Sequence, residues 1–207
     1  MTQRATSRPF VLVGLALLVF LSVLTYFVNK SNNVKRAIIT ANAIEFNKSY
    51  AGATLHTTVG DIRIEFLHED APKTIFNFIE LVEKRFYNGT KFHYVLRNFL
   101  IQGGDPLSRG TNKTLYGTGG PGYSLPSEKS PMLQMKQGIV AMANIGKDTS
   151  GSQFFIVTAL ELLALNGKFT AFARVIGGFD VLEKINNVPT DDNVPRYPIE
   201  VTSIEID

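Results

Sequence analysis

The chain has 207 residues, 44% of them hydrophobic, which is enough for one domain of ordinary size with its own core and an appendage. It contains no cysteine, which excludes disulfides, thiol catalysis and zinc sites built on cysteine. The net charge of +3 arises in residues 1–36, which hold five basic and no acidic side chains. The remainder carries 16 basic and 18 acidic side chains and is therefore not expected to bind nucleic acid.

An uncharged apolar run of 19 residues extends from Phe10 to Val28. As a helix it would be about 28 Å long, close to the roughly 30 Å hydrocarbon core of a bilayer. A cleaved signal peptide usually has a shorter apolar region, and the small-residue sequence at 41–43 lies too far beyond the run to serve it. We therefore predict a short tail over 1–9 and a single-pass transmembrane anchor over 10–28, in contact with the lipid bilayer.

The orientation of this anchor is less clearly encoded than its length. Arg4 and Arg8 precede the apolar run, and Lys30, Lys35 and Arg36 follow it, so the positive charges are nearly balanced. A very short tail before a long apolar run usually stays in the cytosol. We therefore expect the rest of the chain on the extracytoplasmic side of the cell membrane.

Residues 29–52 are polar or mixed in character and are interpreted as a juxtamembrane tether. From Ala53 the pattern predicts two strands within 53–67, joined by a turn at Gly60-Asp61. A helix is predicted within 69–90, with Asp70 as its cap and Pro72 in its first turn. Its apolar face is expected to contain Ile75, Ile79, Val82 and Phe86.

The second half of the body alternates short apolar segments with Gly-rich or polar turns. Strands are predicted at 91–96, 98–103, 138–143, 153–158 and 198–206, and a second helix is predicted at 178–186. The inward side of this helix is expected to contain Phe179, Leu182 and Ile185. Many short strands with only two helices predict a mainly β domain over 53–207, folded as a closed antiparallel barrel with helices over its ends.

Three patterns that suggest other chemistry do not fit their context. The sequence GTGGPG at 117–122 matches a dinucleotide-binding fingerprint, but Pro121 prevents the helix that the fingerprint requires. His56, His68 and His93 lack the spacing of metal ligands. The serines form neither a G-x-S-x-G motif nor a recognisable Ser/His/Asp set. No metal or cofactor is therefore expected.

Three separated segments carry the functional signal: FHYVLRNFLIQGGD at 92–105, GIVAMANIGKDTSGSQFFIVTA at 138–159 and LNGKFTAFARVIGGFDVLEKI at 165–185. In order and spacing this pattern resembles the cyclophilin family of peptidyl-prolyl cis-trans isomerases, over about residues 53–207. The resemblance implies an eight-stranded antiparallel barrel capped by two helices, with a shallow outer groove that takes an X-Pro peptide.

The chemistry of such a groove requires neither a nucleophile nor a metal. Rotation about an amide meets a barrier of about 18–20 kcal/mol, and X-Pro bonds interconvert in tens to hundreds of seconds without help. A catalyst needs an apolar pocket that holds the proline ring while the preceding carbonyl turns. It also needs a hydrogen-bond donor that favours the twisted amide over either planar form.

The resemblance assigns roles to particular positions. Gln102 would be an amide donor to the twisting bond, Gln153 would make a further polar contact, and Gly117 would line a neighbouring pocket. The edge that holds the peptide backbone would be Ala143, Asn144 and Ile145. The pocket would contain Phe99, Leu100, Phe155 and Leu165.

The sequence departs from the family at the strongest donor. Tyr94 stands where the family has an arginine, Phe169 replaces the usual histidine of the pocket, and Ala164 replaces an aromatic residue. Arg97 lies three residues beyond Tyr94, with the opposite strand parity. A tyrosine hydroxyl donates a neutral hydrogen bond, and charge-assisted bonds are roughly twice as strong.

Two functions remain open at this point. The first is a slowed prolyl isomerase acting on unfolded extracytoplasmic proteins, with Tyr94, Phe99 and Gln102 as its catalytic residues. The second is a non-catalytic module that binds proline-containing peptides or acts as a chaperone. We favour the isomerase, and we expect a monomer.

Overall fold

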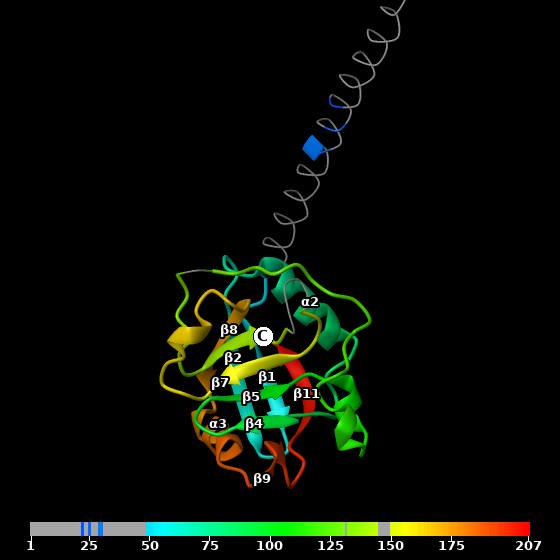
Figure 1. Ribbon diagram of the computed structural model, residues 1–207, viewed down its shortest axis with the longest axis vertical. Helices are drawn as coiled ribbons and strands as arrows, with labels where there is room; N and C mark the ends of the chain where they lie inside the picture. The colour runs from blue at the N-terminus through cyan, green and yellow to red at the C-terminus, as the bar shows by residue number, and fades with distance from the viewer. Residues whose placement is uncertain (1–21, 23–24, 26–28, 31–48, 131, 145–149) are drawn as a thin grey trace, which may run out of the picture. The chain divides into compact units, whose positions relative to one another are not determined.

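The computed structural model describes residues 22, 25, 29–30, 49–130, 132–144 and 150–207. The predicted tail at 1–9 lies outside the described residues, as do nearly all of the predicted anchor at 10–28 and most of the tether at 29–52. Among the residues that are described, no helix is both long and apolar enough to cross a membrane. The chain divides into two compact units, and the second, Ala43–Asp207, contains the sheet and helices described below (Figure 1).

The body is mainly β, as predicted, and its principal sheet is antiparallel with nine strands in the order β3-β11-β1-β2-β8-β6-β7-β5-β4. The strand bounds are β1 (Gly52–Thr57), β2 (Gly60–Phe66), β3 (Thr90–Lys91), β4 (Tyr94–Leu96), β5 (Leu100–Gly103), β6 (Ile139–Met142), β7 (Phe154–Val157), β8 (Ala171–Gly177) and β11 (Glu200–Ile206). A separate hairpin pairs β9 (Thr190–Asp191) with β10 (Val194–Pro195). Short 3-10 helices occur at η1 (Pro106–Arg109), η2 (Lys113–Leu115) and η3 (Leu163–Leu165).

The prediction of a closed eight-stranded barrel is wrong in this structure, because the sheet curls into a half-barrel whose two edges do not pair. The edge strands β3 and β4 are consecutive in the chain and are separated only by Phe92 and His93. These two residues do not form a hairpin turn, because β3 pairs with β11 and β4 pairs with β5.

The first hairpin confirms the predicted alternation of buried and exposed residues in β2, but its turn lies at other residues than predicted. Thr57 pairs with Gly60, so Thr58 and Val59 form the turn, and Gly60 already belongs to β2. Gly60 has a φ of +129°, which disfavours any residue with a side chain, and this explains why glycine occurs there. The expected turn at Gly60-Asp61 is therefore wrong by two residues.

The first helix of the body, α2 (Pro72–Glu83), begins with a proline as predicted, but Asp70 does not cap it. Ala71 occupies the N-cap position and makes no side-chain cap hydrogen bond. The carboxylate of Glu128 accepts hydrogen bonds from the backbone N–H groups of Lys73 (3.1 Å) and Thr74 (2.8 Å) instead. A negative charge at this position also interacts favourably with the helix dipole.

The buried faces of the two helices agree largely with prediction. In α2, Ile75 and Ile79 are fully buried and Val82 is only partly buried, as is Phe86, which lies beyond the end of the helix. The second helix, α3 (Phe179–Asn186), buries Leu182 and Ile185 as expected. Phe179 is 46% exposed, because it starts the helix immediately after the left-handed Gly178, so the prediction that it faces inward is wrong.

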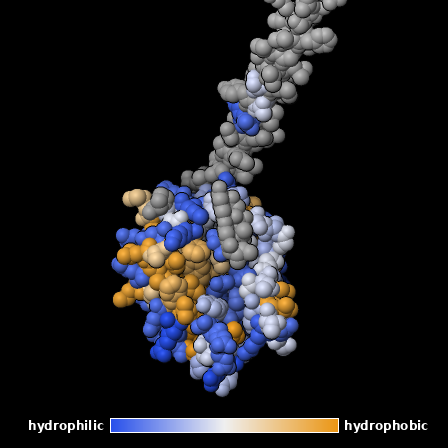
Figure 2. Space-filling model, viewed as in Figure 1, coloured by the Kyte–Doolittle hydropathy of each residue, from blue (hydrophilic) through white to orange (hydrophobic). Residues whose placement is uncertain are grey.

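Strand alternation divides the core into two clusters. The larger cluster lies inside the curled sheet and packs aromatic rings, with Phe78 in contact with Phe154 and Phe172. The smaller cluster, on the other face of β6 and β7, contains Met135, Ile139, Ala141, Phe155, Val157 and Ala171. Figure 2 shows apolar side chains at the surface of the body. The second cluster supports the site described next.

A histidine on the first hairpin predicts a pH dependence of stability. His56 Nδ1 lies 2.9 Å from Asp61 Oδ1, and its Nε2 lies 3.6 Å from Glu205 Oε2. The Asp61 hydrogen bond, more than any other contact, raises the pKa of His56 above its ordinary value of 6.5. Because the pKa of His56 is higher in the folded state than in the unfolded state, protonated His56 stabilises the fold fully at pH values below the unfolded-state pKa. This stabilisation is lost as the pH rises through the folded-state pKa.

We expect Asp61→Asn to lower the His56 pKa measured by NMR titration and to remove a small increment of unfolding free energy at pH 5 but not at pH 9. The increment is small because both side chains are solvent-exposed. His68→Gln is the control and should leave the His56 titration unchanged. An unchanged His56 pKa in Asp61→Asn would show that the hydrogen bond does not hold the proton.

Candidate functional site

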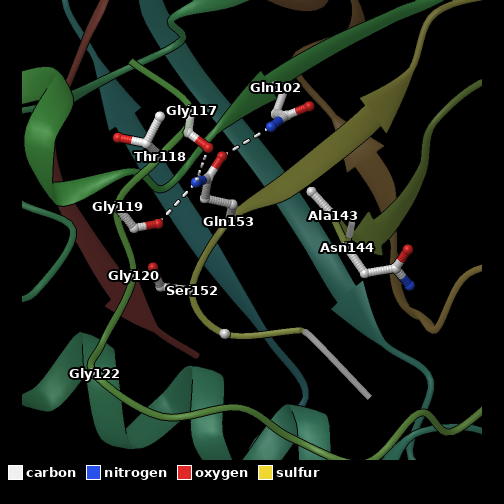
Figure 3. Close-up of a pocket in the computed structure, with 11 residues that line it drawn as sticks. Gln102, Gly117, Thr118, Gly119, Gly120, Gly122, Ala143, Asn144, Ser152 and Gln153 are labelled. Carbon is white, nitrogen blue, oxygen red and sulfur yellow. Dashed lines mark hydrogen bonds between the residues drawn. The ribbon is translucent and has the colours of Figure 1, made fainter. Parts of the chain in front are cut away.

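The predicted site residues converge on the outer face of β5 and β7. These strands are antiparallel neighbours, with Gln102 opposite Phe155 and Leu100 opposite Val157. A groove of about 690 Å³ opens beside them (Figure 3). Its lining residues are Gln102, Gly117, Thr118, Gly119, Gly120, Gly122, Ala143, Asn144, Gly151, Ser152 and Gln153.

Two glutamine side chains are held in fixed orientations within this groove. Gln102 Nε2 donates to Gln153 Oε1 at 2.8 Å. Gln153 Nε2 donates in turn to the carbonyl oxygens of Gly117 (2.9 Å) and Gly119 (2.8 Å), as the dashed lines in Figure 3 show. A primary amide has two N–H donors and a carbonyl acceptor, so Gln102 retains one N–H for a further partner. The prediction named both residues but not the bond between them.

Asp105 organises the loop that supports this pair, and the sequence analysis did not assign it a role. Its side chain is fully buried, and its carboxylate accepts hydrogen bonds from the backbone N–H groups of Leu107 (2.8 Å) and Gly117 (2.5 Å). The preceding Gly104 has a φ of +81°, and a Cβ there would lie 2.5 Å from the carbonyl oxygen of Ser152. The Gly-Gly-Asp turn was the available sequence signal, because glycine permits this close approach and buried aspartate needs donors.

The apolar part of the site adjoins the groove through Ala143. Leu100, Phe155, Leu165 and Phe169 belong to the same cluster as Ala143. The rings of Phe155 and Phe169 meet edge to face, with centroids 5.1 Å apart and an interplanar angle of 87°. Phe169 therefore extends the apolar surface where a histidine would have added a polar group.

Of the remaining residues considered in the sequence analysis, some line the groove and others do not. Phe99 is partly buried in the turn before β5 and lies outside the apolar cluster formed around Phe155. Asn144 lines the groove, whereas Ile145 falls outside the described residues. Arg97 lies exposed in the turn between β4 and β5.

Tyr94 lies directly opposite Gln102, on the edge strand β4. It is partly buried and lines a hollow of about 180 Å³ together with Gln102, Gly117, Tyr116, His93, Lys113 and Val194. Burial is the main influence on the His93 pKa and lowers it, so that imidazole is neutral near pH 7. Among the residues lining this hollow, Lys113 on η2 is positively charged, and its side chain is exposed.

A second cation near this hollow is already engaged. Lys91 is 9% exposed, and its Nζ donates to the carbonyl oxygens of Ser108 (2.7 Å), Arg109 (3.1 Å) and Gly110 (3.1 Å) at the end of η1. All three donors of an ammonium group are thereby used. Lys91 therefore holds the loop in place and leaves the groove without its charge.

Residues 53–206 match the protein family described as cyclophilin type peptidyl-prolyl cis-trans isomerase/CLD. The chain belongs to this family. Among similar proteins, peptidyl-prolyl cis-trans isomerase B of Streptomyces anulatus is 43% identical over 171 residues, which cover 74% of this chain and 93% of the relative. Peptidyl-prolyl cis-trans isomerase-like 2 of Rhizopus delemar is 37% identical over 190 residues, but this cyclophilin spans only 33% of that longer protein.

Solved structures give the same result. A crystal structure of a Cryptosporidium parvum cyclophilin type peptidyl-prolyl cis-trans isomerase in the presence of the dipeptide Ala-Pro has a TM-score of 0.68 and 34% identity. The similarity covers 75% of this cyclophilin and 98% of that chain. Family membership confirms the resemblance inferred from the three sequence segments.

Proposed function

We propose that this cyclophilin catalyses cis-trans isomerisation of X-Pro bonds in unfolded polypeptides, and that its turnover is reduced by Tyr94. The observation that carries the proposal is the fixed Gln102–Gln153 pair beside the apolar cluster of Phe155, which is buried beneath partly exposed Leu100, Leu165 and Phe169. The proline ring would rest on that cluster, while Gln102 donates its remaining N–H to the turning amide. Because the groove is already formed, such a donor can stabilise the twisted amide without rearranging.

The reduced turnover follows from the chemistry of the donors near the twisting bond. The hydroxyl of Tyr94 is neutral, and neutral hydrogen bonds are about half as strong as those from a cation. Loss of one preorganised donor costs on the order of 10²–10³ in rate in other enzymes. Tyr94 and Gln102 would share the role of hydrogen-bond donor to the twisted amide. Together they would stabilise the twisted amide relative to the planar forms less than a guanidinium does.

The experiment that tests this function is an X-Pro isomerisation assay on the full-length protein. We expect a catalysed rate above the spontaneous one, and we expect Phe99→Ala to lower it more than it lowers the melting temperature, because the family resemblance assigns Phe99 to the proline pocket and its side chain is only partly buried. Ile64→Ala is the control: Ile64 is 1% exposed, so its loss should cost about 2–5 kcal/mol of unfolding free energy and leave the activity of the folded fraction intact. A Phe99→Ala variant that loses only stability would place the groove elsewhere.

A second function deserves the same assay, because Tyr94 replaces the strongest donor of the family. A non-catalytic module would bind proline-containing peptides through the same groove without accelerating their isomerisation. Binding without turnover in the full-length protein would select this alternative. We propose a monomer in either case.

We further propose that residues 10–28 anchor the protein in the cell membrane and that its clients are extracytoplasmic. The length and lack of charge of this segment support the anchor. We expect full-length protein to remain in the membrane fraction after washes with high salt and with alkali, whereas a peripheral protein would be released. Recovery of a soluble mature form trimmed after Val28 would contradict the anchor.

A further inference from the structure

A second apolar surface continues from the proposed proline pocket along β7. Gln153 and Phe155 lie on the groove face, Val157 follows in the same cluster, and Ala159 continues it beyond the end of the strand. A strand advances about 3.3 Å per residue, so Phe155 and Ala159 are at most roughly 13 Å apart. The apolar pocket and this second surface therefore adjoin within one packed cluster.

The second surface, here called the apolar platform, consists of Leu133, Leu160, Leu162 and Leu163, above the buried Met135. Leu160 is 81% exposed and Leu163 is 65% exposed, three positions apart in the sequence. Single exposed leucines are common on proteins, but these two flank Leu162, which packs with Leu133 and Met135 in the cluster of the proline pocket. An apolar area is visible on this side of the body in Figure 2.

The platform is held by backbone hydrogen bonds between its two segments. Leu162 N donates to the Met135 carbonyl at 2.7 Å, and Gln137 N donates to the Leu160 carbonyl at 3.2 Å. The side-chain oxygen of Asn166 accepts from Met135 N at 2.8 Å. The leucines are therefore presented on a fixed backbone, which reduces the entropy that a partner must remove on binding.

We infer that the apolar platform binds large aliphatic or aromatic side chains of a client, three to four residues from the proline. This inference rests on the proposed function of the groove. An extended peptide advances about 3.3 Å per residue, so a chain with its proline at Phe155 reaches the platform at that spacing. The preferred substrates are thus unfolded segments rich in leucine or phenylalanine, rather than exposed proline turns of folded proteins.

Other occupants fit the platform less well. Four side chains offer on the order of a few hundred Å², below the roughly 800 Å² per partner of a stable dimer. Exposed Glu161 and Lys136 lie opposite each other in an isolated β-bridge between the platform segments, so this pair offers no net positive charge to the anionic headgroups of a membrane surface. An extended apolar peptide needs neither a large area nor a positive charge.

The test uses full-length protein and three labelled peptides, each with one proline. One carries leucines three and four residues before the proline, one carries them at the same positions after it, and one has alanines at all of these positions. We expect one leucine peptide to bind about 10-fold more tightly than the alanine peptide in a fluorescence anisotropy titration. We expect Leu160→Ser/Leu163→Ser to reduce that ratio to about 1 without changing the dissociation constant for the alanine peptide.

Two controls keep this result specific. Tyr197→Ser removes another large side chain, 76% exposed, that lines none of the hollows of the groove, and should preserve the 10-fold ratio. The single variant Leu160→Ser should give an intermediate ratio, which protects the test if the double variant loses stability. The melting temperature of each variant is measured alongside.

The outcomes separate this inference from the proposed function. Equal affinity of wild type for all three peptides, or a ratio that persists in the double variant, would overturn the platform inference even if every peptide is isomerised. A ratio that collapses in the double variant supports the inference even if no peptide is isomerised, in which case the isomerase proposal fails alone. If the double variant changes only sedimentation or binding to phosphatidylcholine vesicles, the platform belongs to a second copy or to a bilayer and the inference is wrong.

Discussion

Replacing Tyr94 with arginine is expected to raise the isomerase kcat of the full-length protein by about 10-fold or more. Tyr94 lies opposite Gln102 and beside a hollow of about 180 Å³, so a guanidinium at this position has room near the turning amide. The gain should appear in kcat and not in KM, because the charge-assisted donor is needed mostly by the twisted amide. The measurement is an X-Pro isomerisation assay over a range of peptide concentrations.

Tyr94→Phe is the matched control, since it keeps the ring and removes only the hydroxyl. A slow isomerase that relies on the hydroxyl should lose most of its remaining kcat, whereas a peptide-binding module should keep its affinity unchanged. If neither substitution changes the rate, then Tyr94 does not act on the amide. Lys113, which lines the same hollow, would then be the next residue to substitute.

Asp105→Ala is expected to produce the largest loss at the site. The substitution leaves the part-buried N–H groups of Leu107 and Gly117 without their acceptor, and each such loss costs about 1–3 kcal/mol when the donor stays dry. We therefore expect the unfolding free energy to fall by roughly 2–4 kcal/mol in urea titrations, with some relief from water entering the loop. Because the Gly117 carbonyl also holds Gln153, kcat should fall by about 10-fold in the folded fraction.

The conservative variant tests whether Asp105 positions the groove or only stabilises it. Asp105→Asn retains one acceptor oxygen and should recover part of the stability, but kcat should recover only if that oxygen faces Gly117. Thr114→Ala removes an exposed hydrogen bond within η2 and should change neither quantity. Wild-type kcat in a destabilised Asp105→Ala protein would show that the loop does not orient the two glutamines.

Local patterns in the sequence were sufficient for most of the elements. Ile62 and Ile64 alternate with Arg63 in β2, and their burial follows directly from a period of two. Strand β8 was missed because Ala171, Phe172 and Ala173 are all buried, so the segment gives a continuous apolar run without alternation. The second helix was predicted at nearly its observed bounds because Leu182 and Ile185 repeat at helical spacing.

Contacts between distant segments could not be predicted in this way. Glu128 caps α2 from 54 residues beyond Thr74, and no local motif marks a carboxylate that acts so far along the chain. Gln102 and Gln153 were both assigned to the site through family resemblance, yet their mutual hydrogen bond depends on the register of β5 with β7. The edges of the sheet likewise depend on how far the whole sheet curls.

The position of β11 in the sheet has a consequence for how this protein is made. β11 contains the last strand residues of the chain and lies between β3 and β1, near the beginning of the domain. The hydrogen bond from Glu200 N to Thr58 Oγ1 joins residues 142 positions apart. At a synthesis rate of about 5–20 residues per second, β1, which can pair early with β2, must wait roughly 7–30 s for its second partner to be translated. During that interval one edge of β1 is unpaired, so the nascent sheet has an open edge that β11 closes only at the end of synthesis.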